Sequence, residues 1–142
     1  MIVHHSSIGL RTAGFSDCKD ITGDLELCVK ESRVRDGLLT VMVSGSTAAV
    51  TTIEYESGAV SDLKLALDRI APLEIEYAHN VRWGDGNGFS HVRAALMKPS
   101  LTIPVKDGRL CLGTWQQVVF LDFDNKPRTR SVVVQVMGVE KT

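Results

Sequence analysis

Hydrophobic and polar positions follow two different periods along the chain. The helical period is clearest in the middle, where Val60, Leu63, Leu67 and Ile70 recur every three or four positions and Pro72 follows. This spacing predicts a helix with one apolar face that ends before the proline.

Two further helices are predicted from weaker signals. Thr22 can cap a helix that carries apolar residues at helical spacing and ends near "RDG", with Gly37 as its left-handed stop. Ser90 can cap another helix, in which the small residues Ala94 and Ala95 suit close packing.

Strand-like patterns occupy much of the remaining sequence. Strands are predicted at residues 2–12, 38–44, 47–53, 100–105, 109–112, 116–123 and 130–137, with a short strand ahead of His79. The helices do not alternate regularly with these strands, which favours an α+β fold with a mostly antiparallel or mixed sheet in a single domain over residues 1–142. The strands "VVFLDF" and "RSVVVQV" are apolar on both faces, so either subunit contacts or helices must cover the second face.

Composition narrows the class of protein. The 142 residues are 44% hydrophobic and 23% charged, with a formal net charge of −1, so nothing favours general binding to nucleic acid or to an anionic membrane. The apolar runs are too short to span a membrane, and the first residues lack the pattern of a signal peptide. The three cysteines form no CxxC pair, which together with these absences indicates a cytoplasmic protein with reduced thiols.

Two histidines are candidates for metal binding. His79 and His91 lie twelve residues apart, on either side of a glycine-rich loop that contains Asp85 and Asn87. Imidazole is a good ligand for zinc, and glycines allow a loop to fold back and bring two ligands together. The alternative is a flexible turn in which both histidines have structural roles. Of the adjacent pair His4 and His5, at most one can join such a site, because neighbours on a strand face opposite sides.

Carboxylates and arginines supply further candidates. Glu54 ends an apolar strand, where it faces either a cleft or solvent, whereas Asp62 is expected in the first turn of the following helix. Arg128 and Arg130 point to the same side of a strand, where they suit either phosphate binding or the charged end of a strand. In "GTWQQ", Trp115 is predicted to lie in the core and Gln116 to face the other side.

Five blocks of sequence resemble the YjbQ-like family, also called the secondary thiamine-phosphate synthase family. They are "DIT" at 20–22, "STAAVTTIE" at 46–54, "DGNGFSHVRAALMKPSLTIPV" at 85–105, "LGTWQQV" at 112–118 and "DNKPRTRSVVVQV" at 124–136. The resemblance implies a homotrimer with polar pockets near subunit boundaries and a site that often holds a divalent metal, zinc above all and magnesium as the alternative.

The resemblance also assigns roles by position. It implies His79 and His91 as metal ligands and Thr47, Asn87, Gln116, Arg128 and Arg130 as residues that bind a small phosphorylated metabolite. Glu54 and Asp85 become the catalytic candidates, because a carboxylate near a developing cation lowers the barrier to its formation. The chain departs from the family at two positions: Gly45 and Phe89 stand where many members have histidines, which predicts weaker metal binding, use of Asp85, or no metal.

The leading functional prediction is therefore a metal-associated enzyme that joins a pyrimidine pyrophosphate to a thiazole phosphate, a reaction that can be a side activity. One alternative is a non-catalytic trimer that binds a metal or a small molecule. The other is a metal-dependent hydrolase of a phosphorylated metabolite.

Overall fold

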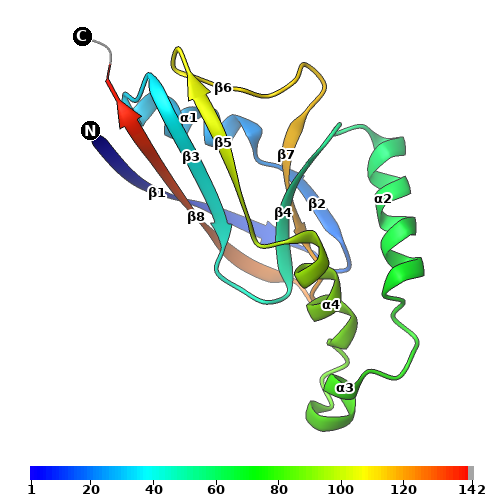
Figure 1. Ribbon diagram of the computed structural model, residues 1–142. Helices are drawn as coiled ribbons and strands as arrows, with labels where there is room; N and C mark the ends of the chain where they lie inside the picture. The colour runs from blue at the N-terminus through cyan, green and yellow to red at the C-terminus, as the bar shows by residue number, and fades with distance from the viewer. Residues whose placement is uncertain (141–142) are drawn as a thin grey trace.

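The computed structural model describes residues 1–140, which fold into eight strands and four helices (Figure 1). The elements are β1 (Ile2–Thr12), β2 (Asp17–Asp20), α1 (Thr22–Ser32), β3 (Asp36–Val43), β4 (Ala48–Ile53), α2 (Ser57–Ile70), α3 (Ala78–Trp83), α4 (Gly88–Met97), β5 (Ser100–Lys106), β6 (Arg109–Leu110), β7 (Gln117–Asp122) and β8 (Arg128–Val139). All strand pairs are antiparallel and form two sheets, of order β1-β8-β3-β5-β6 and β2-β7-β4. The predicted α+β class is confirmed.

Strand β7 lies at the centre of the molecule, between two hydrophobic cores. Val118 and Phe120 face the larger core, which is formed with α1 and the inner face of the five-stranded sheet. Val119 and Leu121 face a smaller core closed by side chains of α2 and α4. Both faces of β7 are thus covered within one chain, by helices and sheet and not by a neighbouring subunit.

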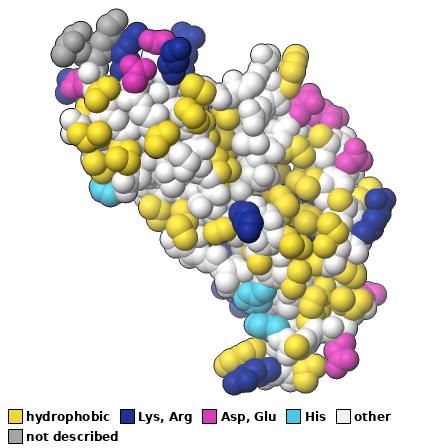
Figure 2. All heavy atoms as spheres, in the orientation of Figure 1, with side chains coloured by type: hydrophobic (Ala, Val, Ile, Leu, Met, Phe, Trp, Pro, Cys, Tyr) yellow, Lys and Arg dark blue, Asp and Glu magenta, His cyan; other side chains and the backbone are white. Residues whose placement is uncertain are grey.

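Strand β8 differs, because its outer face is open. Val132, Val134 and Val136 are buried, but Val133 and Met137 on the opposite face remain 45% and 37% exposed. The neighbouring strand β3 adds Leu38 and Met42, 45% and 47% exposed, and hydrophobic side chains lie over this part of the sheet (Figure 2). We refer to these residues of β3 and β8 as the outer sheet face.

The ends of α1 differ from the prediction. Thr22 does not cap the helix; its N–H donates instead to Asp20 Oδ1. The left-handed residue at the other end is Arg33, with φ 63°. Gly37 lies in β3, where an added Cβ would stand 2.0 Å from the carbonyl oxygen of Met137. A glycine is therefore required there for close strand packing and not for a helix stop.

Helix α2 forms where the apolar period predicts it, but its start and its burial differ. The side chain of Glu56 caps the helix by accepting hydrogen bonds from the N–H groups of Gly58 and Ala59, so Asp62 is not in the first turn. Of the apolar face, Leu67 is buried, whereas Ile70 is 63% exposed.

The region between α2 and β5 is more helical than expected. The short strand predicted ahead of His79 is absent from the structure, and His79 lies in α3. Helix α4 begins at Gly88, so Ser90 is a buried residue inside it and not its cap, while Ala95 is exposed. Trp115 also lies outside the core, with 72% of its surface exposed.

Helix α4 ends at a strained residue. Lys98 follows it with φ 80° and ψ 146°, close to a region that is populated essentially by glycine alone and that costs other residues about 1–3 kcal/mol. The carbonyl of Lys98 accepts a hydrogen bond of 3.2 Å from Val50 N–H, which ties β4 to the start of β5. Within residues 1–140, no helix has the length and apolar character needed to cross a bilayer.

Candidate functional site

His79 and His91 meet where α3 packs against α4. Their ring centroids are 4.3 Å apart and the rings are tilted by 45°. Asp85, from the loop between the helices, places Oδ1 3.1 Å from Nδ1 of His79. One ligand atom from each of these three residues lies within 4.8 Å of the other two. The predicted convergence of the two histidines is confirmed, and we call the three residues the histidine cluster; histidine side chains gather at the surface near α3 and α4 (Figure 2).

The glycines of the loop bring the two helices together. Gly84 ends α3 with φ 67°, and Gly86 has φ 68°, both in the left-handed region that favours glycine. Gly88 has a different role: an added Cβ would stand 2.4 Å from Cβ of Tyr77. Its N–H donates to Asn80 Oδ1 at 2.8 Å, so the close contact between α3 and α4 depends on the missing side chain.

The donor set of the histidine cluster fits a divalent metal. Nδ1 of His79 is buried but has no hydrogen-bond partner among the described residues, because its 3.1 Å contact with Asp85 is poorly aligned for a hydrogen bond. Ligand atoms of a tetrahedral zinc ion lie about 3.4 Å apart, so modest side-chain rotation from the observed spacing suffices. The side chains of His79 and Asp85 are 31% and 46% exposed, which leaves the cluster open to a ligand from solvent.

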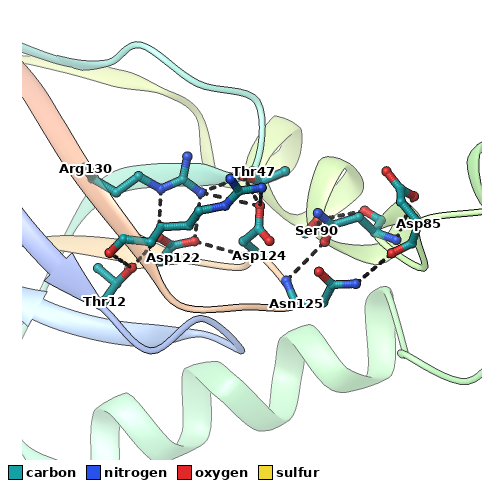
Figure 3. A network of polar contacts seen from close by, with 10 residues as sticks. Thr12, Thr47, Asp85, Ser90, Asp122, Asp124, Asn125 and Arg130 are labelled. Atoms are coloured by element: carbon teal, nitrogen blue, oxygen red, sulfur yellow. Dashed lines mark hydrogen bonds and ion pairs between the residues drawn. The ribbon is translucent and has the colours of Figure 1, made fainter. Parts of the chain in front are cut away.

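Asn87 holds the loop in place and is largely inaccessible. It is 6% exposed, and its Oδ1 accepts hydrogen bonds from Ser90 Oγ and from the N–H of Asn125. Asn125 in turn donates from Nδ2 to the carbonyl of Asp85 at 2.8 Å. These bonds fasten the loop between α3 and α4 to the turn between β7 and β8 (Figure 3).

Beyond that turn lies a second polar cluster, formed where the end of β7 meets the start of β8. Its members are Thr12, Thr47, Asp122, Asp124, Arg128 and Arg130, which we call the aspartate–arginine network (Figure 3). Arg130 donates to both carboxylate oxygens of Asp122, from Nε at 2.8 Å and from Nη2 at 2.9 Å. Asp122 is fully buried. The bidentate hydrogen bonds from Arg130 supply the positive charge that stabilises its buried carboxylate.

Asp124 is the second buried carboxylate of the network. Its Oδ2 accepts from Thr47 Oγ1 at 3.0 Å and lies 3.2 Å from Nη2 of Arg128. Burial by itself raises the pKa of Asp124, but the hydrogen bonds from Thr47, Arg128 and Asn87 and the charge of Arg128 outweigh it, so the pKa is lowered. Its Oδ1 is buried without a well-aligned partner among the described residues, although the Asn87 amide lies near.

These contacts change the expectation for the two arginines. They point to the same side of β8, as predicted, but that side carries the buried aspartates and is not an open face. Arg130 is only 16% exposed at its side chain and also donates to Thr47 at 2.6 Å, so both Arg130 and Thr47 are occupied within the fold. Arg128, at 40% exposed, retains access to solvent.

Glu54 and Gln116 lie at the other end of β4 and β7. Ile53 pairs with Gln117, whereas Ala48 pairs with Asp122 at the network; five residues of strand separate the two ends by about 16 Å. Glu54 is exposed, and Gln116 donates from Nε2 to Thr52 Oγ1 at 3.0 Å. One chain therefore does not bring Glu54 to Asp85, or Gln116 to the histidine cluster.

The structure also places the two positions where this chain lacks the family's histidines. At Gly45 an added Cβ would lie 3.3 Å from Nη1 of Arg130, beside the aspartate–arginine network. Phe89 is 2% exposed, stacks on Phe15 and lies beneath the guanidinium of Arg93. Neither position belongs to the histidine cluster, which forms here from the three residues present.

Sequence reasoning missed the buried members of the site. Asp122 and Asp124 follow an apolar run as "LDFD", with the same two-residue spacing as Arg128 and Arg130, and this matched spacing was the available signal. Arg93 was missed as well: it is 2% exposed and donates to Ala71 O, Ser16 Oγ and Asp68 Oδ1.

Comparisons with known proteins agree on one family. The sequence profile described as "UPF0047 protein YjbQ-like" matches residues 6–139. A UPF0047 protein of Archaeoglobus fulgidus is 38% identical over 90% of this chain and 97% of its own length, and one of Methanothermobacter thermautotrophicus is 37% identical over 97% and 94%.

Solved structures give the same result. A YbjQ-like protein from Sulfolobus solfataricus has a TM-score of 0.92 at 28% identity and covers 96% of this chain and 98% of its own. A YjbQ/UPF0047 family protein from Clostridium acetobutylicum has a TM-score of 0.86 at 34% identity, covering 93% and 99%.

Proposed function

Because the chain belongs to the YjbQ-like UPF0047 family, we propose that it is a metal-associated enzyme that acts on a small phosphorylated metabolite. The nearest nameable chemistry is that of a secondary thiamine-phosphate synthase. The observation that carries the proposal is the histidine cluster, in which Nδ1 of His79 is buried without a hydrogen bond beside Asp85 and His91.

His79, Asp85 and His91 would hold the ion. Three protein ligands leave a coordination position open, as in catalytic zinc sites. Two imidazoles favour zinc or another transition metal over magnesium, which prefers oxygen ligands. The chemistry that a bound divalent ion supplies is stabilisation of negative charge on phosphate oxygens.

The reaction itself exchanges one bond for another. A bond forms between the thiazole nitrogen and the pyrimidine methylene carbon, while the bond from that carbon to the pyrophosphate oxygen breaks and pyrophosphate leaves with the electron pair. Arg128 is the partly exposed cation of the aspartate–arginine network and would bind a phosphate oxygen. Glu54 would stabilise the positive charge on the methylene.

Assembly of several subunits would place Glu54 of one chain near the site of another. Because Glu54 lies at the far end of β4 from the aspartate–arginine network, its participation requires a neighbouring subunit. The outer sheet face is suited to such contact: Leu38, Met42, Val133 and Met137 are exposed, and the polar residues between them on these strands, such as Thr40 and Gln135, are uncharged. We propose that this face contributes to a homotrimer.

One observation favours a second candidate: Glu54 is distant from the histidine cluster within one chain. The resemblance also implies histidines at the positions of Gly45 and Phe89, which this chain lacks. A trimer that binds a metal or a small molecule without turnover would need neither the two histidines nor Glu54.

Turnover decides between the two candidates. With the pyrimidine pyrophosphate and the thiazole phosphate as substrates, we expect product formation that chelator abolishes and zinc restores. Glu54→Gln should keep ligand affinity but lower the rate, since the amide preserves shape and removes charge. Tight binding with no product would favour the non-catalytic trimer, and release of inorganic phosphate from other substrates would identify a hydrolase.

A further inference from the structure

A groove of about 450 Å³ lies between β4 and β5, away from the histidine cluster. The polar residues that line it include Thr52, Lys98, Ser100, Thr102 and Gln116. The groove lies at the C-terminal end of α4, and Lys98 follows His91 by seven residues, about 10 Å along a helix.

The groove lies between β4 and β5, which belong to different sheets and are joined by a backbone hydrogen bond at one end. Val50 N–H bonds to the carbonyl of Lys98 at the base, and β4 forms the edge of its sheet. The peptide groups of alternate residues point to the same side of a strand. Since Val50 N–H points toward β5, the N–H of Thr52 points into the same gap.

Strand β5 contributes in the same way from the other side. The carbonyl of Pro104 bonds to Cys111 N–H, away from β3, so the N–H of Thr102 also faces the gap. Gln116 donates to the hydroxyl oxygen of Thr52, which leaves the hydroxyl proton of Thr52 free to donate elsewhere. The groove thus offers several hydrogen-bond donors around one cation.

Lys98 is the unusual feature of this site. Its backbone angles, φ 80° and ψ 146°, lie close to a region that only glycine occupies without strain. No carboxylate of residues 1–140 lies within ion-pair distance of its ammonium group. Lys98 thus combines strained backbone angles with an ammonium group that is not paired with any described carboxylate, at a position that lines the groove.

We propose that this groove is a second ligand site, which binds a phosphate group, free or as a phosphate monoester, through Lys98, the hydroxyl of Thr52 and the N–H groups of Thr52 and Thr102. The proposal does not depend on the histidine cluster or on the enzymatic reaction. In this proposal the cation that binds the phosphate group is Lys98, because Arg130 is already hydrogen-bonded to Asp122.

The binding test uses inorganic phosphate and backbone amide NMR of the whole chain, with chloride at equal ionic strength as reference. We expect saturable shifts at Thr52, Lys98 and Thr102. Lys98→Ala should weaken binding by roughly tenfold or more, as expected for loss of a charge-assisted hydrogen bond, while Lys98→Arg and the control Lys106→Ala, which removes an exposed cation at the far end of β5, should bind. Unchanged binding by Lys98→Ala would overturn the site.

Two further variants test the backbone strain and the location of the bound anion. Lys98→Gly should raise the Tm by about 4 °C through relief of strain and lose phosphate binding, whereas Lys98→Ala should not raise it. Lys98→Gly with unchanged Tm would refute the strain at this position. In His79→Ala/His91→Ala the shifts at Thr52 and Thr102 should persist; their loss would place the anion at the histidine cluster instead.

Discussion

The side chain of Asp122 accepts four hydrogen bonds although it is fully buried: from Thr12 Oγ1, from Nε and Nη2 of Arg130, and from Asp124 N–H. Arg128 makes its contact with Asp124 from a side chain that is 40% exposed. The two arginines of "RTR" are therefore not equivalent, even though they share one side of β8.

Removal of each arginine should show this difference. Arg130→Ala leaves Asp122 buried without its counter-charge and should lower the free energy of unfolding by about 3–5 kcal/mol. Arg128→Ala should cost less, about 1–2 kcal/mol, because Arg128 is partly exposed and the buried Asp124 keeps its hydrogen bond from Thr47 and has Arg130 Nη2 3.7 Å away. Denaturant unfolding of both variants measures the contrast, and equal losses would mean that Asp122 finds another partner.

Because the pKa of Asp124 is lowered in the folded chain, the free energy of unfolding should decrease at acid pH. A carboxyl whose pKa is lower in the folded than in the unfolded chain stabilises the fold above its unfolded pKa, and this contribution disappears as pH falls through the folded pKa. Wild-type stability should therefore fall below about pH 4, with a shallower fall in Asp124→Asn. Asp24→Asn, at an exposed site without an ion pair among the described residues, is the control; identical slopes for wild type and Asp124→Asn would contradict this assignment.

At the scale of elements, the sequence predicts helices and strands best where one hydrophobic period continues along the whole element. Helix α2 and strands β1, β5 and β8 follow their patterns closely. Helix α3 was missed because it has six residues and no buried side chain, so it carries no apolar stripe. Two helix starts differ from the prediction. Thr22 was expected to cap α1, but it is the first residue of the helix and its N–H bonds to Asp20. Asp62 was expected in the first turn of α2, but that helix begins earlier, at Ser57 after the cap Glu56.

The part of the candidate site that depends on local sequence could be predicted, and the part that depends on contacts between distant segments could not. The glycines between His79 and His91 indicate convergence through local geometry. Asp122, by contrast, ends a strand whose apolar pattern indicates core, and its pairing with Arg130 depends on how the β7–β8 connection crosses between sheets. Trp115 was misassigned because its aromatic character favours burial, yet it lies in an exposed turn.

Gly88→Ala tests whether the α3–α4 contact maintains the histidine cluster. The added Cβ would stand 2.4 Å from Tyr77 Cβ, so the helices must separate, with a stability loss of about 1–3 kcal/mol. We expect zinc affinity to fall in parallel. Gly9→Ala, where an added Cβ has nothing within 4 Å, is the control and should leave zinc affinity unchanged. If Gly88→Ala binds zinc as tightly as the wild type, the histidine cluster does not depend on the α3–α4 contact.

At the scale of the whole molecule, the exposed outer sheet face is the basis of the proposed homotrimer. We expect light scattering to give a mass three times that of the 15.5 kDa chain. Met137→Lys places a charge on this face and should shift the protein to monomer, whereas Leu65→Lys, on α2 and 50% exposed in the wild type, should not. A monomeric mass for the wild type would contradict the proposed trimer and the proposed shared site that includes Glu54.

Metal binding by the histidine cluster is the central claim about this molecule. Crystals grown with zinc and measured on both sides of the zinc absorption edge should show one anomalous peak per chain, bonded to His79, Asp85 and His91. The peak should be lost in His79→Ala and in His91→Ala and retained in His5→Ala, a variant of an exposed histidine outside the cluster. An empty cluster in zinc-grown crystals, or a peak that both cluster variants retain, would contradict the proposal.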